Sequence, residues 1–356
     1  MTRMAEREPT RVTVGVDTHR DVHVAVALDQ LGRRLDQLEL ATTRAGYERL
    51  LAWAQRLGVV EAVGVEGTGC YGAGLARHLR GQGVPVVEVM RPNRQTRRRK
   101  GKSDPNDAEA AARAVLSAEA GGSPKAGDDL VEMIRVLRVA RGSALKARTQ
   151  AINALRSLLV TAPPELRDQL RALSTSRLVS KAAQLRPGQL DRPLSASKLA
   201  LRHLACRCQT LEAEISSLDS QLVELTATAC PQLIGAFGVG VDTAGALLVA
   251  AGDNPDRLHT EAAFAMLCGC SPIPASSGKT NRHRLNRGGN RQANAALYRI
   301  VLVRLRYHQP TKDYLERRTH EGKSKREIIR CLKRYVTREV YAALTQTGDQ
   351  RLARAA

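Results

Sequence analysis

The stretch RRRKGKSDPNDAEAAARA, from Arg97 to Ala114, decides how the first third of this chain is read. A run of cations leads into two acids three residues apart, which open an alanine-rich segment suited to a helix. Ser103 or Asp104 can cap the first N–H groups of that helix, and Pro105 suits its first turn. Asp104 and Asp107 then lie about one turn apart on one face. Such acids either stabilise a helix start through its dipole or share a divalent cation.

The residues before this stretch predict the element order βββαβαβ. Strands are expected at 12–16, 22–28, 33–40, 62–66 and 84–89, with helices at 45–56 and up to about 81. This order, followed by an acidic helix, is that of the ribonuclease-H-like fold, whose acids lie on the first strand, at the end of the fourth and on the last helix. Those positions hold Asp17, Glu66, Asp104 and Asp107.

Four acids in these places favour a metal site over four unrelated turn or cap residues. Crowded carboxylates repel one another and raise one another's pKa values, so the cluster makes sense around a hard cation. Mg²⁺ is the expected cofactor, with Mn²⁺ as the alternative, because both prefer oxygen ligands. Metal ions held in this way activate an attacking oxygen and stabilise a leaving one in phosphoryl transfer.

The composition points to a polyanionic partner. The 356 residues suffice for two or three domains, and the 56 basic and 35 acidic residues give a net charge of +21. Aromatic residues make up only 3%, so phosphate contacts are expected to outweigh base stacking. No apolar stretch approaches a membrane span and no apolar signal core opens the chain, which predicts a cytoplasmic protein. The seven scattered cysteines predict reduced thiols and no zinc site.

Two helical patterns follow. A long helix is expected over 128–161, with an apolar stripe and a cationic face that includes Arg138, Arg141 and Arg148. That face either contacts nucleic acid or is simply solvated. A heptad over 201–225 predicts a coiled coil, whose partner is either the preceding helix or the same helix of another subunit. Its two seam positions hold Leu201, Cys208, Ile215, Leu222 and Leu204, Leu211, Leu218, Leu225.

The C-terminal part, from about residue 231, contains the segment LCGCSPIPASSGKTNRHRLNRGGNR at 267–291. Ser276 and Ser277 precede Gly278 and a cationic run formed by Lys279, Arg282, His283, Arg284, Arg287 and Arg291. A serine between a glycine and a cationic loop is a phosphate contact, a turn residue or a nucleophile. Helices are expected at 292–307 and 324–344.

Six segments together resemble the DEDD-type insertion-sequence transposases, the group founded on insertion sequence 110 that includes the Piv DNA invertases. They are GVDTHRDVHVAVAL, VGVEGTGCYG, KGKSDPNDAEAAARA, GVGVDTAGALLVAAGD, CGCSPIPASSGK and NRGGNRQANAALYR. The resemblance covers nearly the whole chain and is weakest over 165–193. It implies a RuvC-like catalytic domain at 1–122, a helical coiled-coil domain at 123–230 and a mostly helical transposase domain at 231–356.

The resemblance also implies the site residues. The acids would be Asp17, Glu66, Asp104 and Asp107. The essential serine of the family lies in a G-x-x-P-(x)4-S-G pattern, which Gly269, Pro272, Ser277 and Gly278 fit. Ser277 is therefore the predicted nucleophile, Ser276 the alternative, and His283 a candidate base. Cys270 and Ser271 depart from the pattern, since more apolar residues are expected there.

The implied activity is DNA recombination guided by a structured noncoding bridge RNA that pairs with donor and target DNA. The implied assembly is a homotetramer, a dimer of dimers, associated with a prokaryotic nucleoid. Strand exchange would pass through a 5′-phosphoserine, whereas the alternative is a hydrolytic nuclease resembling Holliday-junction resolvases. The residues expected to contact nucleic acid are Arg97, Arg98, Arg99, Lys100, Lys102, Arg138, Arg141, Arg148, Lys279, Arg282, Arg284 and Arg287.

Overall fold

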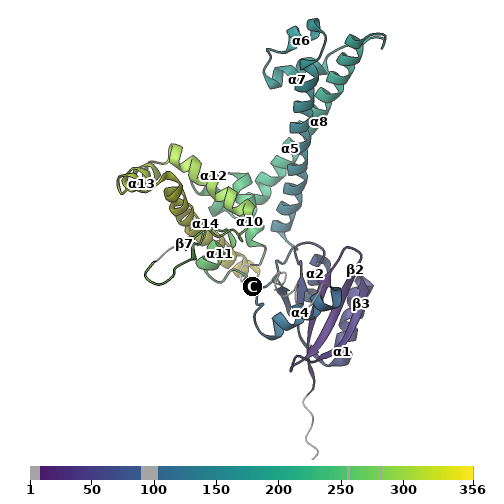
Figure 1. The fold of residues 1–356 in the computed structure, drawn as a ribbon, viewed down its shortest axis with the longest axis vertical. Helices are drawn as coiled ribbons and strands as arrows, with labels where there is room; N and C mark the ends of the chain where they lie inside the picture. The colour runs from purple at the N-terminus through teal and green to yellow at the C-terminus, as the bar shows by residue number, and fades with distance from the viewer. Residues whose placement is uncertain (1–8, 90–102, 255–256, 281–282, 356) are drawn as a thin grey trace, which may run out of the picture. The chain divides into compact units, whose positions relative to one another are not determined.

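The computed structural model describes residues 9–89, 103–254, 257–280 and 283–355 (Figure 1). The chain divides into two compact units. The first comprises Met1–Asp129 and Ala251–Ala263, and the second comprises Leu130–Ala250 and Phe264–Ala356. The predicted boundary at 122/123 lies inside the first unit, and most of the other two predicted domains lies in the second unit. Whether 123–230 and 231–356 are separate domains stays a prediction.

The first unit is built on a five-stranded mixed sheet with the strand order β3-β2-β1-β4-β5. β1, β2 and β3 pair antiparallel, whereas β4 runs parallel to both β1 and β5. The mixed α/β N-terminal part and its predicted element order are thereby confirmed. The elements are β1 (Arg11–Thr18), β2 (Val22–Asp29), β3 (Arg34–Ala41), α1 (Arg44–Leu57), β4 (Val59–Glu66), α2 (Ala73–Gly81), β5 (Val86–Val89) and α4 (Asp104–Leu116).

Helices cover both faces of this sheet, which explains why β1 and β2 are buried throughout almost their whole length. Side chains alternate between the faces of a strand, so every second residue of β1 points to the same layer. One layer joins Val14 and Val16 to Leu50 and Trp53 of α1 and Leu75 of α2. The opposite layer joins Val24, Val26 and Leu28 of β2 to Ala108 and Ala112 of α4.

The segment Ala251–Ala263 completes the first unit although it lies far along the chain. Asn254 accepts a hydrogen bond from the Ala126 N–H at 3.1 Å and donates one to the Pro124 carbonyl at 3.1 Å. Arg257 donates to the Ser123 carbonyl at 3.0 Å, and its guanidinium lies 3.6 Å from the Glu88 carboxylate. The predicted linker near 121–124 is therefore hydrogen-bonded to the segment Ala251–Ala263.

Two long helices dominate one part of the second unit, α5 (Leu130–Val160) and α8 (Pro193–Ala229), which pack side by side (Figure 1). They are antiparallel, because Arg141 pairs with Asp219 whereas Arg148, seven residues later, pairs with Glu212, seven residues earlier. The heptad was compatible with packing on the preceding helix or on the same helix of another subunit. In the structure, α8 packs on α5 of the same chain. The first seam set, Leu201, Cys208, Ile215 and Leu222, is buried. The second set, Leu204, Leu211, Leu218 and Leu225, is only half-buried.

The basic segment between these helices forms α6 (Pro164–Leu170) and α7 (Thr175–Ala183). Leu166, Leu170 and Leu178 of these short helices pack on Leu155 of α5 and Leu201 of α8. The segment that the sequence left unresolved is thus a helical cap over the end of the pair.

The remainder of the second unit is mostly helical, as expected. α12 and α14 match the predicted helices, whereas α11 and α13 were not predicted. Among the described residues, no helix is long and apolar enough to cross a membrane. The elements are α9 (Pro231–Gly235), α10 (Val241–Ala251), α11 (Glu261–Leu267), β6 (Ile273–Pro274), β7 (His283–Arg284), α12 (Arg291–Tyr307), α13 (Gln309–His320) and α14 (Lys325–Ala355).

Candidate functional site

Two of the predicted acids end neighbouring strands of the sheet. Asp17 lies near the end of β1 and Glu66 ends β4, and the parallel register that pairs Val16 with Val65 brings the next residues to the same edge. The Thr18 hydroxyl donates to the Glu66 carbonyl at 2.8 Å and ties the two strand ends together. Asp17 and Glu66 are both only 8% exposed.

The other two acids reach this edge because α4 lies directly on the sheet. A Cβ atom on Gly15 would come within 2.1 Å of the Ala108 carbonyl oxygen and 2.2 Å of the Ala112 nitrogen, so only glycine allows this approach. The first turn of α4 carries Asp104 and Asp107, which share a face as their spacing predicts.

The start of α4 differs from the sequence expectation in one detail. Ser103 occupies the N-cap position in an extended conformation, and Pro105 lies in the first turn. The Ser103 side chain makes no capping hydrogen bond to the described residues, and its carbonyl accepts from the Asp107 N–H at 3.0 Å. The acids of the first turn are therefore the main complement to the positive end of the helix.

Asp17, His19 and Asp104 form a cluster at this edge. His19 Nε2 lies 3.3 Å from an oxygen of Asp17 and 3.4 Å from an oxygen of Asp104. One ligand atom from each residue lies within 4.8 Å of the others, the kind of grouping that can hold a metal ion. Asp107 is 5% exposed and lies one turn along α4 from Asp104.

The charges at this edge act on Asp17. Burial raises the pKa of its carboxyl, the imidazole of His19 lowers that pKa, and the carboxylates of Glu66, Asp107 and Asp104 raise it again. All four predicted acids are therefore close enough to interact electrostatically.

A divalent cation fits this site on two grounds. The donor set is dominated by carboxylate oxygens, the ligands that Mg²⁺ and Mn²⁺ prefer. Burial is the main cause of the raised pKa of Asp17, and a cation would offset the further rise that the neighbouring carboxylates cause. These are properties of the donor set and do not distinguish Mg²⁺ from Mn²⁺.

Sequence reasoning missed the two histidines of this region. His19 follows Asp17 by two residues, and its imidazole lies between the carboxylates of Asp17 and Asp104. His23 is fully buried, and its Nδ1 accepts a hydrogen bond from the His19 N–H at 3.3 Å. Burial holds the pKa of the His23 imidazole below its usual value.

The predicted nucleophile, Ser277, belongs to the second unit and lies at the tip of a hairpin formed by β6 and β7. Its N–H donates to the Thr280 carbonyl at 3.2 Å, and the Thr280 N–H donates back at 3.1 Å. Gly278 opens the two-residue turn with φ +54°, a conformation that favours glycine. Ser276, Ser277 and Lys279 are all exposed.

The base of this hairpin is pinned to the helices beneath it. A Cβ atom on Gly289 would come within 2.3 Å of the Gly269 nitrogen, so the two ends of the loop touch. Asn294 of α12 donates to the Cys268 carbonyl at 2.7 Å and accepts from Lys333 of α14 at 2.6 Å. Ser277 is thus an exposed hydroxyl on a loop with a fixed base.

The three arginines predicted on α5 are engaged inside the second unit. Arg138 bonds to Asp242 at 2.7 Å, Arg141 to Asp219 and Arg148 to Glu212. The acids that balance this face are not on α5 itself but on α8 and α10. Contact of these arginines with nucleic acid stays a prediction.

The other predicted contacts divide into two groups. Lys279, Arg284 and Arg287 are exposed on or beside the hairpin, with Arg284 in β7. The remaining predicted contacts lie outside the described residues, namely Arg97, Arg98, Arg99, Lys100, Lys102 and Arg282.

Comparison with known proteins gives the family. Residues 14–164 match a family model of DEDD transposases of the IS110 type, described as "Transposase". Residues 231–316 match a second model, described as "Transposase IS116/IS110/IS902 family". The chain belongs to the IS110 transposase family. A curated relative, the "Insertion element IS110 uncharacterized 43.6 kDa protein" of Streptomyces coelicolor, is 30% identical over 154 residues. That match spans 43% of this chain and 36% of the length of the relative.

The two family models cover the acidic edge of the sheet and the serine hairpin, respectively. The first includes Asp17, Glu66, Asp104 and Asp107, and the second includes Ser277. Membership in a transposase family makes DNA the substrate class to be tested.

Proposed function

We propose that this protein is a transposase that cuts and rejoins DNA strands with the help of Mg²⁺. The observation that carries the proposal is the meeting of buried Asp17 and Glu66 at adjacent strand ends with the first turn of α4. This placement supports a RuvC-like, ribonuclease-H-like assignment of the first unit. Asp17, Glu66, Asp104 and Asp107 are the proposed metal ligands, and Mn²⁺ is the alternative ion. When bound there, the cation would polarise the scissile phosphate and stabilise developing negative charge.

The proposed covalent step uses Ser277. Its Oγ forms a bond to phosphorus while the bond from phosphorus to the 3′ oxygen breaks. The hydroxyl proton passes to a base, for which exposed His283 of β7 is the candidate, and the released 3′ oxygen takes up a proton. The phosphoserine keeps the energy of the phosphodiester, so another 3′ hydroxyl can displace Oγ and rejoin a strand without a high-energy cofactor.

The partners follow from the same proposal. The basic composition suits donor and target DNA together with a structured bridge RNA, because base pairing then reads the sequence while the protein contacts the backbone. The α5–α8 pair supports a coiled-coil middle, and the proposed assembly is a homotetramer built as a dimer of dimers. Nucleoid association is proposed on the same grounds. Sequencing the RNA that copurifies with the chain tests the RNA partner.

Trapping tests the covalent mechanism. The protein, its copurified RNA and labelled DNA are incubated with Mg²⁺, denatured and analysed for DNA linked to protein. Wild type and Ser276→Ala should form the adduct, whereas Ser277→Ala and Asp17→Ala should not. Cleavage without an adduct, retained in Ser277→Ala, would show instead a hydrolytic nuclease like the Holliday-junction resolvases. Full activity of Asp17→Ala and Glu66→Ala would point to a noncatalytic scaffold.

A further inference from the structure

The second unit contains a cavity of about 750 Å³ at the base of the serine hairpin. Gly269–Pro272 and 283–287 line it from the hairpin, and α12, α13 and α14 supply the other walls. The volume is within the range of sites that enclose small organic ligands, roughly 300–1,000 Å³. It suits one or two unpaired nucleotides better than a double helix.

The walls of this cavity are strongly cationic. Among the described residues that line it there are no aspartates or glutamates. Its cationic side chains come from the hairpin, α13 and α14, and they are Arg284, Arg287, Arg318, Arg326, Arg330, Lys333, Arg334 and Arg338. A hollow lined with so many cations favours a ligand with several negative charges, as a phosphate backbone has.

Lys333, which lines the cavity, also favours a negatively charged ligand. Its ammonium group donates to Asn294 Oδ1 at 2.6 Å, a neutral partner. Burial lowers the pKa of Lys333, Cys270 and Cys268 raise it and Arg330 lowers it, and no carboxylate contributes. A phosphate in the cavity would supply the missing negative charge.

Aromatic rings occupy the same cavity. Tyr298 of α12, Tyr314 of α13 and Tyr335 of α14 all line it, although aromatic residues make up only 3% of the chain. Tyr298 is 43% exposed and Tyr335 is 46% exposed, so their rings are open to a ligand.

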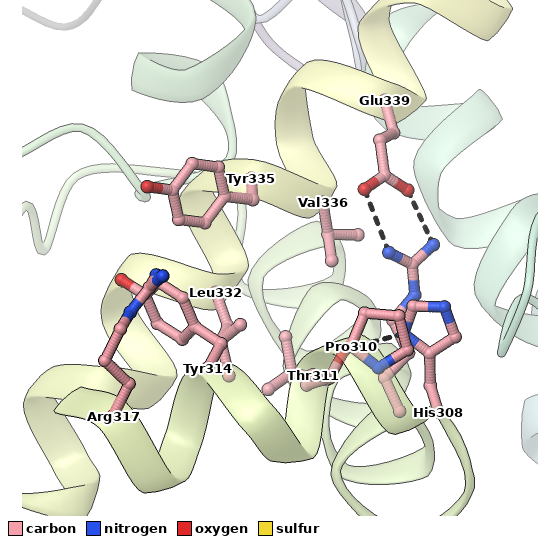
Figure 2. Close-up of a pocket in the computed structure, with 11 residues that line it drawn as sticks. His308, Pro310, Thr311, Tyr314, Arg317, Leu332, Tyr335, Val336 and Glu339 are labelled. Atoms are coloured by element: carbon pink, nitrogen blue, oxygen red, sulfur yellow. Dashed lines mark hydrogen bonds and ion pairs between the residues drawn. The ribbon is translucent and has the colours of Figure 1, made fainter. Parts of the chain in front are cut away.

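The tyrosines are held in place by their neighbours. Tyr314 and Tyr335 contact edge to face with centroids 5.6 Å apart. They also line a smaller adjoining cavity of about 320 Å³, shown in Figure 2. There the buried Arg304 of α12 pairs with Glu339 of α14 at 2.7 Å, which joins the two helices. Tyr314 and Tyr335 line both cavities.

We propose that this cavity binds an unpaired stretch of a nucleic-acid strand, with the tyrosine rings stacking on bases and the arginines contacting phosphates. A duplex offers phosphates but keeps its base faces stacked on one another, whereas an unpaired strand offers both. The proposal rests on the proposed function only in taking nucleic acid as the substrate class. It assigns strand binding to residues other than the acids and the serine.

Binding without cleavage tests it. The full chain is titrated into a fluorescent oligothymidylate, and separately into a duplex of the same length, with EDTA present so that no metal-dependent cutting occurs. Tyr298→Ala combined with Tyr335→Ala should weaken single-strand binding roughly fivefold or more for each ring, and Tyr335→Phe should bind like wild type. Arg330→Ala should reduce the slope of log K against log salt by about 0.7 on the single strand.

Matched controls lie on the same helix α12. Tyr307 is 61% exposed and lies under Arg306 at 5.2 Å, but neither residue lines the cavity. Tyr307→Ala and Arg306→Ala should therefore leave the ring-dependent part of binding unchanged. Ser277→Ala should bind the strand like wild type, so failure of the covalent mechanism and failure of this proposal are separate results.

A second measurement is independent of the variants. Wild type is photocrosslinked to an oligonucleotide containing 5-iodouracil, and the linked peptides are identified by mass spectrometry. Crosslinks to Tyr298 or Tyr335 support the proposal, and crosslinks that avoid the cavity overturn it. Unchanged single-strand affinity of the double tyrosine variant would also overturn it, as would an equal loss in Tyr307→Ala or an equal loss for the duplex.

Discussion

At the scale of single residues, Asp17 shows how a carboxylate proposed as a metal ligand opposes folding. It is buried beside three other acids, and its raised pKa means that its ionised form is less favourable in the folded chain than in the unfolded chain. Above that pKa the group is ionised in both states and lowers the free energy of unfolding. As the pH falls through the raised pKa the folded chain takes up the proton, and this penalty disappears.

Asp17→Asn should therefore stabilise the first unit in the absence of metal, by roughly 0.5–2 kcal/mol near neutral pH. The gain should shrink in mild acid, because wild-type Asp17 is then protonated. Thermal unfolding followed by Trp53 fluorescence in EDTA measures both effects, since this tryptophan lies in the core of the first unit. Adding Mg²⁺ should stabilise wild type more than the variant.

The control for this measurement is Asp21→Asn. Asp21 is close in sequence, but its side chain is 83% exposed, so its removal should change little. An Asp17→Asn variant that is no more stable than wild type at neutral pH would contradict the expected sign.

The closeness of the four acids could be predicted from the sequence, whereas the position of His19 beside them was missed. Asp17 and Glu66 end predicted strands, and Asp104 and Asp107 start a predicted helix, so topology places them together. His19 lies just beyond β1, two residues after Asp17. That spacing is the signal available in the sequence, since residues two apart share a face of an extended chain.

At the scale of elements, the α5–α8 pair shows that a heptad predicts a buried apolar stripe but does not identify the helix that packs on it. The repeat predicted a seam of two sets on α8. Leu201, Ile215 and Leu222 of the first set are buried, whereas the leucines of the second set are half-buried. It could not choose the partner, because an apolar stripe packs equally well on another helix of the same chain or of another subunit. The ion pairs Arg141–Asp219 and Arg148–Glu212 identify the partner as α5.

Neighbouring residues on α8 allow a matched test of this packing. Leu222 is 2% exposed and Val223 is 51% exposed. Leu222→Ala should reduce the free energy of unfolding by roughly 2–5 kcal/mol because it leaves a cavity in the seam. Val223→Ala should change it by less than about 0.5 kcal/mol. Urea unfolding followed by far-ultraviolet circular dichroism gives both values, and equal effects would rule out the seam.

The unpredicted helix α13 shows where pattern reading fails. Its sequence QPTKDYLERRTH is mostly polar, and of its residues only Thr311 is buried. A helix of this kind has too few apolar positions for a 3.6-residue period to be visible. It is held instead through contacts such as that of Tyr314 with Tyr335, which only the tertiary structure brings together.

At the scale of the whole molecule, the division into two compact units could not be predicted, because the distant segment Ala251–Ala263 packs with the first 129 residues. The sequence placed a boundary at the glycine-rich linker near 121–124, a sound inference from composition. Asn254 and Arg257, more than a hundred residues further on, bond to that linker. Nothing in a linear pattern of apolar residues announces such long-range contacts between polar groups.

Asn254→Ala should lower the stability of the first unit by about 1–3 kcal/mol, because it removes two hydrogen bonds from half-buried groups. Trp53 fluorescence should report this change. His259→Ala, an exposed position in the same segment, should leave the Trp53 transition unchanged. Leu222→Ala should also leave it unchanged, and a shift there would mean that the two units unfold as one.

The return of Ala251–Ala263 also governs how the chain can be divided for study. A fragment that ends at Asp129 would end near the boundary predicted from the sequence. It would lack Asn254 and Arg257, which bond to the backbone of residues 123–126. The smallest piece that contains the whole first unit joins 1–129 to 251–263 through an artificial tether. Complementation by the 251–263 peptide, added in solution to the shorter fragment, offers a direct view of the same dependence.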